Sequence, residues 1–263
     1  MKIIFLKLGG SLVTDKDKPF TARLEIIRMV GKQIRLVIDI LPDTRLLIGH
    51  GSGSFGHAAA KAVGYVEGDA SAFDPLGFQS IWLAAQQLNR IILDEFNQLG
   101  LPVISFPPSA SIHSAAKKII TWDLSPIQSA LQHNLLPIIF GDTIFDTQLG
   151  GVIYSTEELF LHLSNALKPE AILLAGKEPG VWADFPMKSN IISELTEDNF
   201  SGFQPSINES QSVDVTGGML KKVRLMLQIK RLLPTSEIRI FSGELPDAVL
   251  DCLLGKPLGT SIK

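Results

Sequence analysis

The sequence contains a single cysteine, Cys252, among its 263 residues. One cysteine cannot form an internal disulfide, so the sequence indicates a reducing compartment. Cys252 lies within the apolar residues 249–254, which favours a buried, inert thiol over a nucleophile. The apolar run at residues 3–6 is too short for a signal peptide. We therefore expect a cytoplasmic protein.

Long apolar runs and an excess of one charge are also missing. No uninterrupted apolar stretch approaches the roughly 18 residues that span a bilayer, so we expect no membrane partner. The 24 Lys and Arg against 27 Asp and Glu give a net charge of −3, which excludes a basic nucleic-acid binder as the default reading. Charged residues make up only 19% and hydrophobic residues 45%, which excludes a disordered chain. The sequence predicts a packed globular protein.

Six short apolar runs, each followed by Gly, Pro or polar residues, indicate strands buried on both faces, as in a parallel sheet. They cover residues 3–8, 45–48, 103–106, 136–140, 171–175 and 237–241. Longer segments with helical periodicity lie between them, at residues 24–41, 76–99, 125–132, 156–167 and 218–232. This alternation predicts an α/β sandwich with mostly parallel strands.

The chain shows no obvious linker, so we expect one continuous domain. It would have two lobes, residues 1–168 and 169–263, that meet near residues 166–171. Residues 185–212 are polar and rich in turn formers. They predict either a mobile excursion or small hairpin over a site, or a plain surface loop.

The first glycine-containing turn, Gly9-Gly10-Ser11, follows the first predicted strand directly. Glycines at the carboxyl end of a parallel strand let backbone N–H groups approach an anion closely. Lys7, at the end of the strand, and Lys16, in the following loop, would add two charges for phosphate oxygens. Taken alone, such a turn is more often structural than phosphate-binding.

The second turn contains the spacing G-x-G-x-x-G at Gly51, Gly53 and Gly56. A dinucleotide-binding unit needs a second strand after the helix, and residues 58–75 are polar and turn-like instead. The same residues nearly match a P-loop, with His57 where the lysine belongs. We therefore predict a phosphate-binding turn capped by His57, which would open a helix whose dipole favours anions.

Two more glycine turns follow. Gly141-Asp142-Thr143 comes after an apolar run, and Asp142 either acts in a site or caps a turn, the role that we favour slightly. Later, Gly217 and Gly218 precede a helical segment that carries Lys221 one turn in, which fits a phosphate cradle or a plain capped helix.

Together, the turns gather Lys7, Lys16, Lys221 and a histidine in a chain of net negative charge. Lysines concentrated in glycine turns predict a polyphosphate site. Phosphoryl transfer needs positive charge and positioning around the moving group, with little covalent help from the protein. The set therefore points to a kinase.

The motifs and their order along the chain resemble those of the amino-acid kinase superfamily. Within it they resemble the isopentenyl phosphate kinase family, with the fosfomycin kinases as close relatives. The motifs are Lys7-x-Gly-Gly-Ser11-x-x-Thr14-x-Lys16, Gly51-Ser-Gly-Ser-Phe-Gly-His57, Gly141-Asp142-x-x-Phe145-Asp146 and Asp214-Val-Thr-Gly-Gly-Met-x-x-Lys221. They span nearly the whole chain. The Ser-Phe-Gly-His57 ending favours the isopentenyl phosphate branch over amino-acid or uridylate kinases.

The resemblance implies an open αβα sandwich with the phosphate acceptor in the N-terminal lobe and ATP in the C-terminal lobe. The reaction would be direct in-line transfer from ATP, with Mg²⁺, to isopentenyl phosphate, in a homodimer. The residues implied at the ATP phosphates are Lys7, Gly9, Gly10, Ser11, Gly53, Gly217 and Lys221. Lys16 resembles the transition-state lysine, while His57, Ser52 and Gly150 would hold the acceptor.

Two departures from the family pattern stand out. The family has Ser-Gly-Asp where this chain has Ser155-Thr156-Glu157, so Glu157 either organises the lysines with a longer arm or sits in a helical first turn. Residues 175–182 lack the aspartate of the nucleotide-side motif Thr-Asp-x-x-Gly-Val-Tyr. Lys177 either contacts a phosphate instead or is solvated, and the base preference stays open.

An acceptor tail would need an apolar slot. Phe73, Phe78, Ile81 and Trp82 could line one, although such residues at helical spacing also fit a core. Small residues at 84 and 85 would leave room for longer prenyl chains. Three alternatives remain: a kinase of a small phosphonate such as fosfomycin, a non-catalytic nucleotide or metabolite sensor, and a nicotinamide-dependent oxidoreductase. The missing second strand disfavours the last of these.

Overall fold

The computed structural model describes residues 2–209 and 218–263, whose strands form one large sheet and one smaller one. In spatial order the large sheet contains β12 (Glu194–Leu195), β14 (Thr260–Ile262), β13 (Glu237–Ser242), β9 (Ala171–Gly176), β1 (Lys2–Leu8), β2 (Thr44–His50), β6 (Leu136–Phe140) and β3 (Val103–Ser105). Neighbouring strands pair in parallel, except β13 with β14. The predicted mostly parallel sheet is confirmed.

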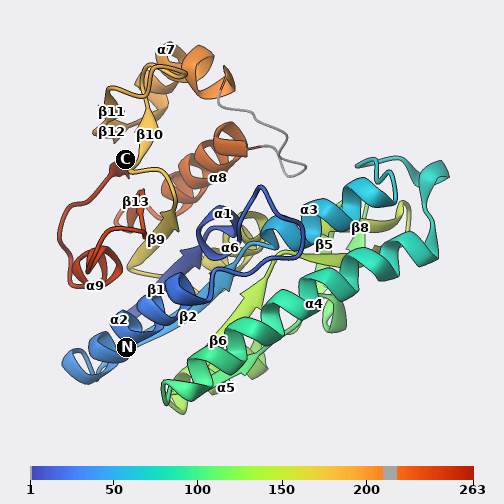
Figure 1. Cartoon of the computed structure of the whole chain (residues 1–263), viewed down its shortest axis with the longest axis horizontal. Coiled ribbons are helices and arrows are strands. Elements are labelled where there is room, and N and C mark those ends of the chain that lie inside the picture. Colours follow the sequence, from blue (N-terminus) through green and yellow to red (C-terminus); the bar gives the residue numbers. More distant parts are fainter. Residues whose placement is uncertain (1, 210–217) are drawn as a thin grey trace.

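Helices cover both faces of this sheet (Figure 1). Strand residues alternate between the faces: in β1, Ile4 and Leu6 pack into one core, and Ile3 and Phe5 into the other. The first core includes α2 (Leu24–Ile40), α3 (Gly53–Ala62), α4 (Pro75–Gln98) and α9 (Ala248–Leu253). The second includes α5 (Ser125–Gln132), α6 (Thr156–Leu167) and α8 (Gly218–Leu232). The five helices predicted from periodicity end within one residue of these bounds, and the αβα sandwich is confirmed.

A smaller, four-stranded sheet was not expected from the sequence. It consists of β5 (Lys118–Trp122), β4 (Ile112–Ala115), β7 (Asp142–Asp146) and β8 (Gly150–Tyr154). The short helix η2 (Pro108–Ala110) contacts β7, and another short helix, η1 (Ala70–Ala72), precedes α4. The prediction of a turn at Gly141-Asp142-Thr143 is wrong, because Asp142 begins β7 and Gly141 alone separates it from β6. The Asp142 carboxylate instead accepts hydrogen bonds from the N–H groups of Ser109 and Thr143, at 3.1 and 2.9 Å.

The polar segment at residues 185–212, which was predicted as an excursion or small hairpin or else as a plain surface loop, contains regular structure. It contains β11 (Ile191–Ile192), which pairs antiparallel with β10 (Val181–Trp182) as a small hairpin, and then β12. The helix α7 (Glu197–Glu209) follows and was not predicted, since few of its positions are apolar. Residues 210–212 lie outside the described part. Figure 1 places α7 and β10 far from the four-stranded sheet.

The large sheet runs through both expected lobes. β9 pairs with β1 along residues 171–175, just past the predicted boundary between residues 168 and 169, so the lobes share one sheet. Within residues 2–209 and 218–263, no helix combines the length and apolar character needed to cross a bilayer.

Candidate active site

Two glycine loops lie against each other at the carboxyl ends of β1 and β2. The register pairs Leu8 with His50, so the residues that follow the two strands are neighbours. A Cβ atom added at Gly10 would lie 2.6 Å from the backbone nitrogen of Gly53. The loops therefore touch through their backbones, and side chains at these positions would push them apart.

The second loop has the backbone geometry of an anion-binding turn. Ser52 has right-handed helical angles, with φ −76° and ψ −13°, while Gly53 has a φ of 50°. A right-handed residue followed by a left-handed one makes successive N–H groups converge on a concavity that suits an anion. Thr14 Oγ1 accepts a hydrogen bond from Ser54 N at 2.9 Å and ties this turn to the first loop.

The helix after this turn begins earlier than predicted. We expected His57 to open a helix over residues 58–63, but Ser52 is the N-cap and α3 already begins at Gly53. His57 therefore lies in the second turn of α3, and the end that attracts anions is at Ser52 and Gly53.

The loops face a central cavity of about 90 Å³. Predicted site residues that line it are Lys7, Gly9, Gly10, Ser11, Lys16, Ser52, Gly53, His57, Glu157 and Lys221. Gly217 lies outside the described residues. Sequence reasoning missed Thr156 and Lys222, which also line the cavity. Lys222 could have been found, because it follows Lys221 at the start of the same helix, whereas nothing in the sequence marks Thr156.

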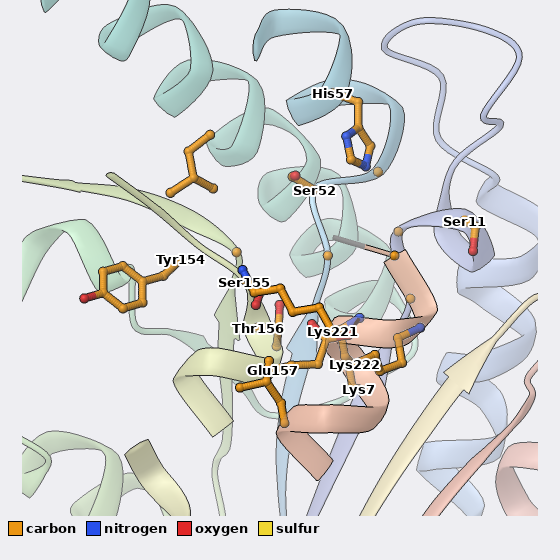
Figure 2. A pocket seen from close by; sticks show the side chains of 18 of the residues that line it. Lys7, Ser11, Ser52, His57, Tyr154, Ser155, Thr156, Glu157, Lys221 and Lys222 are labelled. Carbon is orange, nitrogen blue, oxygen red and sulfur yellow. Dashed lines mark ion pairs between the residues drawn. The ribbon is translucent and has the colours of Figure 1, made fainter. Parts of the chain in front are cut away.

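The cavity has two unlike sides (Figure 2). Ser52 and His57 lie on one side, while Lys7, Lys221 and Lys222 gather with Glu157 on the other. Four lysines and one carboxylate line the described part of this cavity, although the whole chain has a net charge of −3. Such a cluster of positive charge suits bound phosphate groups.

The carboxylate on the lysine side is paired. Glu157 Oε1 lies 2.7 Å from Lys7 Nζ, and both side chains are buried. Burial would raise the pKa of Glu157, but the charges of Lys7 and Lys222 outweigh it and lower that pKa. Glu157 does sit in the first turn of α6, and the capping box of Ser155 and Glu158 fixes where that helix begins. The helix start thus directs Glu157 onto Lys7.

A second ion-pair group lies beside the first. Glu158 Oε1 is 3.1 Å from Lys221 Nζ and 3.5 Å from Lys117 Nζ, and Lys117 also pairs with Glu67. Burial acts to raise the pKa of Glu158, but the two lysines lower it overall. The sequence did not point to Lys117, which reaches this place from the turn between β4 and β5.

A larger cavity of about 760 Å³ adjoins the central one and shares Ser11, Lys16 and Lys222 with it. This volume lies in the range of small-molecule sites. Part of its wall is apolar and consists of Val181, Trp182, Phe185, Ile207 and Met219. Lys177 is exposed and lines it. Glu178 accepts hydrogen bonds from Trp182 Nε1 and Lys188 Nζ, both at 2.7 Å.

On the other side of the central cavity lies a mainly apolar one of about 30 Å³. Its lining includes Phe73, Phe78 and Ile81, three of the residues predicted to hold the acceptor tail. A cavity of about 20 Å³ connects the two: it shares Ser52 and His57 with the first and Ile81 with the second.

Two predicted acceptor residues lie elsewhere. Trp82 is not among the lining residues of these cavities in the described chain, and its Nε1 donates to Ser109 Oγ at 3.1 Å. Gly150 has a φ of 74°, and a Cβ there would lie 2.5 Å from Phe73. It therefore packs against the apolar end and does not line the central cavity with Ser52 and His57. Of the two small residues, Ala85 lines the connecting cavity and Ala84 is buried in the core.

Comparison with known proteins agrees with this arrangement. Residues 2–242 match the amino acid kinase family. The chain is 30% identical to isopentenyl phosphate kinase of Methanocaldococcus jannaschii and 31% identical to that of Methanothermobacter thermautotrophicus, over 99% of this chain and 98% of each relative. It also superimposes on a solved isopentenyl phosphate kinase with a TM-score of 0.80 and 27% identity, over 99% of this chain and all of the other. The chain therefore belongs to the amino acid kinase family, alongside these isopentenyl phosphate kinases.

Proposed function

We propose that this protein transfers the γ-phosphoryl group of ATP to isopentenyl phosphate, giving isopentenyl diphosphate and ADP. The observation that carries the proposal is the order of the cavities. A lysine-lined centre lies between a cavity of nucleotide size and a smaller, mainly apolar one. The named relatives, which match over nearly their whole length, support the same reaction.

In this mechanism an oxygen of the acceptor phosphate attacks the γ-phosphorus while the bond from that phosphorus to the β,γ-bridging oxygen breaks. The chain supplies positioning and charge, and forms no covalent intermediate. Lys16 lines both the nucleotide-sized and the central cavity, so its ammonium would follow the γ-phosphoryl group between its two partners. Lys7, held by Glu157, and Lys221 would neutralise the other phosphate oxygens.

The acceptor phosphate would sit in the turn at Ser52 and Gly53, with His57 donating to it from α3. Gly9, Gly10 and Ser11 line the same cavity. The Gly9 N–H donates to the Ala175 carbonyl at 2.7 Å, so the N–H groups of Gly10 and Ser11 would hold ATP phosphates. The role of Gly217 rests on the family resemblance alone. The prenyl tail would pass the connecting cavity and end against Phe73 and Phe78.

Mg²⁺ would reach the site on the ATP phosphates. Within the described residues, no group of three His, Cys, Asp or Glu side chains could hold a metal ion. Mg²⁺ typically keeps its waters and binds nucleotides through phosphate oxygens, which fits a site whose own groups are mainly lysines. When bound, it would neutralise charge on the β- and γ-phosphates.

We further propose that residues 1–168 provide the acceptor side and residues 169–263 most of the nucleotide side. A cytoplasmic location is supported by the one cysteine, Cys252, which is a buried free thiol. A homodimer is supported by the family resemblance, and light scattering coupled to size-exclusion chromatography would test it.

The phosphonate alternative is less well supported, because fosfomycin is small and polar while the far cavity presents Phe73, Phe78 and Ile81. The test is ADP release from Mg-ATP with isopentenyl phosphate, with fosfomycin and with no acceptor, and ³¹P NMR to identify the product. We expect turnover and a diphosphate product with isopentenyl phosphate only. Turnover with fosfomycin alone, or equal ADP release without an acceptor, would overturn the proposal.

A further inference from the structure

His50 is a buried titratable residue that the mechanism above does not use. It ends β2, one residue before the anion-binding turn, and is fully buried. Its ring stacks on Phe140 with centroids 5.3 Å apart. Burial lowers the pKa of His50 to about 4, so the ring is neutral at neutral pH and carries a single N–H.

The ring contacts a polar atom on each side. Nδ1 lies 3.2 Å from the carbonyl oxygen of Gly51, and Nε2 lies 3.2 Å from the side-chain oxygen Oδ1 of Asn89. The side-chain nitrogen Nδ2 of Asn89 donates to Ser105 Oγ at 2.9 Å. If the one proton were on Nε2, the lone pair of Nδ1 would face the carbonyl oxygen of Gly51, and the two atoms would repel each other. Exchanging the oxygen and nitrogen of the Asn89 amide, which have the same shape, resolves this conflict. The amide NH₂ then donates to Nε2, the Ser105 hydroxyl donates to the amide oxygen, and Nδ1–H donates to the Gly51 carbonyl, so that every contact is a hydrogen bond.

The backbone around His50 is anchored as well. Its carbonyl oxygen accepts hydrogen bonds from Thr156 Oγ1 at 2.6 Å and from Gly141 N at 3.1 Å. The N–H of Gly51 donates to the carbonyl of Leu8 at 3.0 Å. With these groups anchored, the orientation of the next peptide, between Gly51 and Ser52, depends on what holds the Gly51 carbonyl.

A peptide unit is planar and trans, so its carbonyl and N–H point in opposite directions. A hydrogen bond that holds the Gly51 carbonyl on the His50 side therefore directs the Ser52 N–H to the opposite side. The Ser52 N–H is the first donor of the turn in which we place the acceptor phosphate.

We propose that His50 is a positioning residue for the acceptor: its Nδ1–H holds the Gly51 carbonyl and thereby aims the Ser52 N–H at the acceptor phosphate. The inference rests on the proposed function, because it takes the acceptor phosphate to lie at Ser52 and His57. It concerns acceptor affinity, and ATP affinity should not depend on it.

Two substitutions separate positioning from packing. In His50→Asn the amide NH₂ can replace Nδ1–H, but the ring that packs on Phe140 is lost. In His50→Phe the ring packing is kept, but the donor to Gly51 is lost. Calorimetric titration with isopentenyl phosphate in the absence of ATP gives the Kd, and thermal melts give the Tm. The KM for each substrate and kcat follow from steady-state kinetics.

We expect His50→Phe to raise the Kd for isopentenyl phosphate about five- to tenfold, the effect of one lost hydrogen bond, with an unchanged KM for ATP. His50→Asn should bind the acceptor within about twofold of wild type yet have the lower Tm of the two, because it leaves a cavity.

The positioning role is wrong if the variant with the lower Tm, His50→Asn, is also the one that binds the acceptor more weakly. It is also wrong if His50→Phe binds the acceptor as wild type does. The proposed function stands in both cases. Binding by the wild type without turnover would contradict the proposed function only. No binding by the wild type would overturn the acceptor placement, and the positioning role with it.

Discussion

Lys7 and Glu157 form a buried ion pair with 2.7 Å between Nζ and Oε1, although Lys7 lies near the end of β1 and Glu157 in the first turn of α6. Both belong to the wall of the central cavity. The family pattern has an aspartate in this region, and here the longer glutamate reaches the lysine. The pair therefore links the stability of the chain to the charge of the proposed phosphate site.

Glu157→Gln should lower the free energy of unfolding by about 3 kcal/mol, because it leaves the Lys7 ammonium buried without a countercharge. It should also lower kcat by roughly 10- to 100-fold, since the Lys7 side chain would no longer be held in place. Urea unfolding and steady-state kinetics measure the two effects. The matched control is Glu197→Gln, which removes an exposed partner of Arg231 and should cost under about 1 kcal/mol. Equal costs for the two variants would contradict the account.

Asp146 should stabilise the turn that carries Lys117. Its carboxylate accepts hydrogen bonds from the N–H groups of Ala116, Lys117, Gln148 and Leu149 and from Ser114 Oγ, at 2.8–3.0 Å. Burial would raise the pKa of Asp146, but these hydrogen bonds lower it to about 2. A lowered carboxyl pKa contributes stability that is present above the unfolded value and is lost as the pH falls through the folded value.

Asp146→Asn should therefore be less stable than wild type at pH 7 by on the order of 1–2 kcal/mol, after allowance for solvent screening. The difference should shrink as the pH falls from 4 towards 2. Urea unfolding at pH 7, 4 and 2.5 measures it. Asp94→Asn, at an exposed pair with Arg90, is the control and should show little change at any of these pH values. A difference that is independent of pH would contradict this prediction.

Phe78→Ala should shift acceptor preference towards longer chains, because Phe78 lines the apolar cavity and packs against both Phe73 and Phe145. We expect the ratio of kcat/KM for geranyl phosphate to that for isopentenyl phosphate to rise about tenfold or more. Competition assays with both acceptors measure the ratio. Trp82→Ala, one helical turn away and outside the lining of that cavity, is the control. An equal rise in that variant would argue against a tail site at Phe78.

Much of the fold could be predicted because its core helices and strands are long and periodic. Parallel strands place their carboxyl ends at one edge, so the residues after β1 and β2, including Gly10 and Gly53, were expected to meet near one ligand. The charged residues Lys7, Lys16 and Lys221 could be found for the same reason, since each is close to a glycine turn.

The small sheet could not be predicted from local pattern. The turn between β4 and β5 has Ala116 and Lys117 at φ values of 46° and 55°, a conformation that side chains disfavour and that no glycine signals here. Its stabilising partner, Asp146, lies far along the chain. The His50 ring contacts Asn89, and the His50 backbone contacts Thr156. These contacts also join separate elements, so the spacing of residues along the sequence does not indicate them.

The central claim is that the γ-phosphoryl group crosses the lysine-lined cavity on its way to isopentenyl phosphate. The most direct test compares isopentenyl phosphate-dependent ADP release by wild type, Lys16→Ala and Lys18→Ala. Lys18 lies in the same loop, and its side chain is 73% exposed, with Nζ 3.8 Å from Asp15 Oδ2. Because it lines neither cavity, it is a matched control. We predict that Lys16→Ala lowers kcat on the order of 10²–10³-fold and that Lys18→Ala leaves it near wild type. Similar kcat values in both variants would contradict the claim.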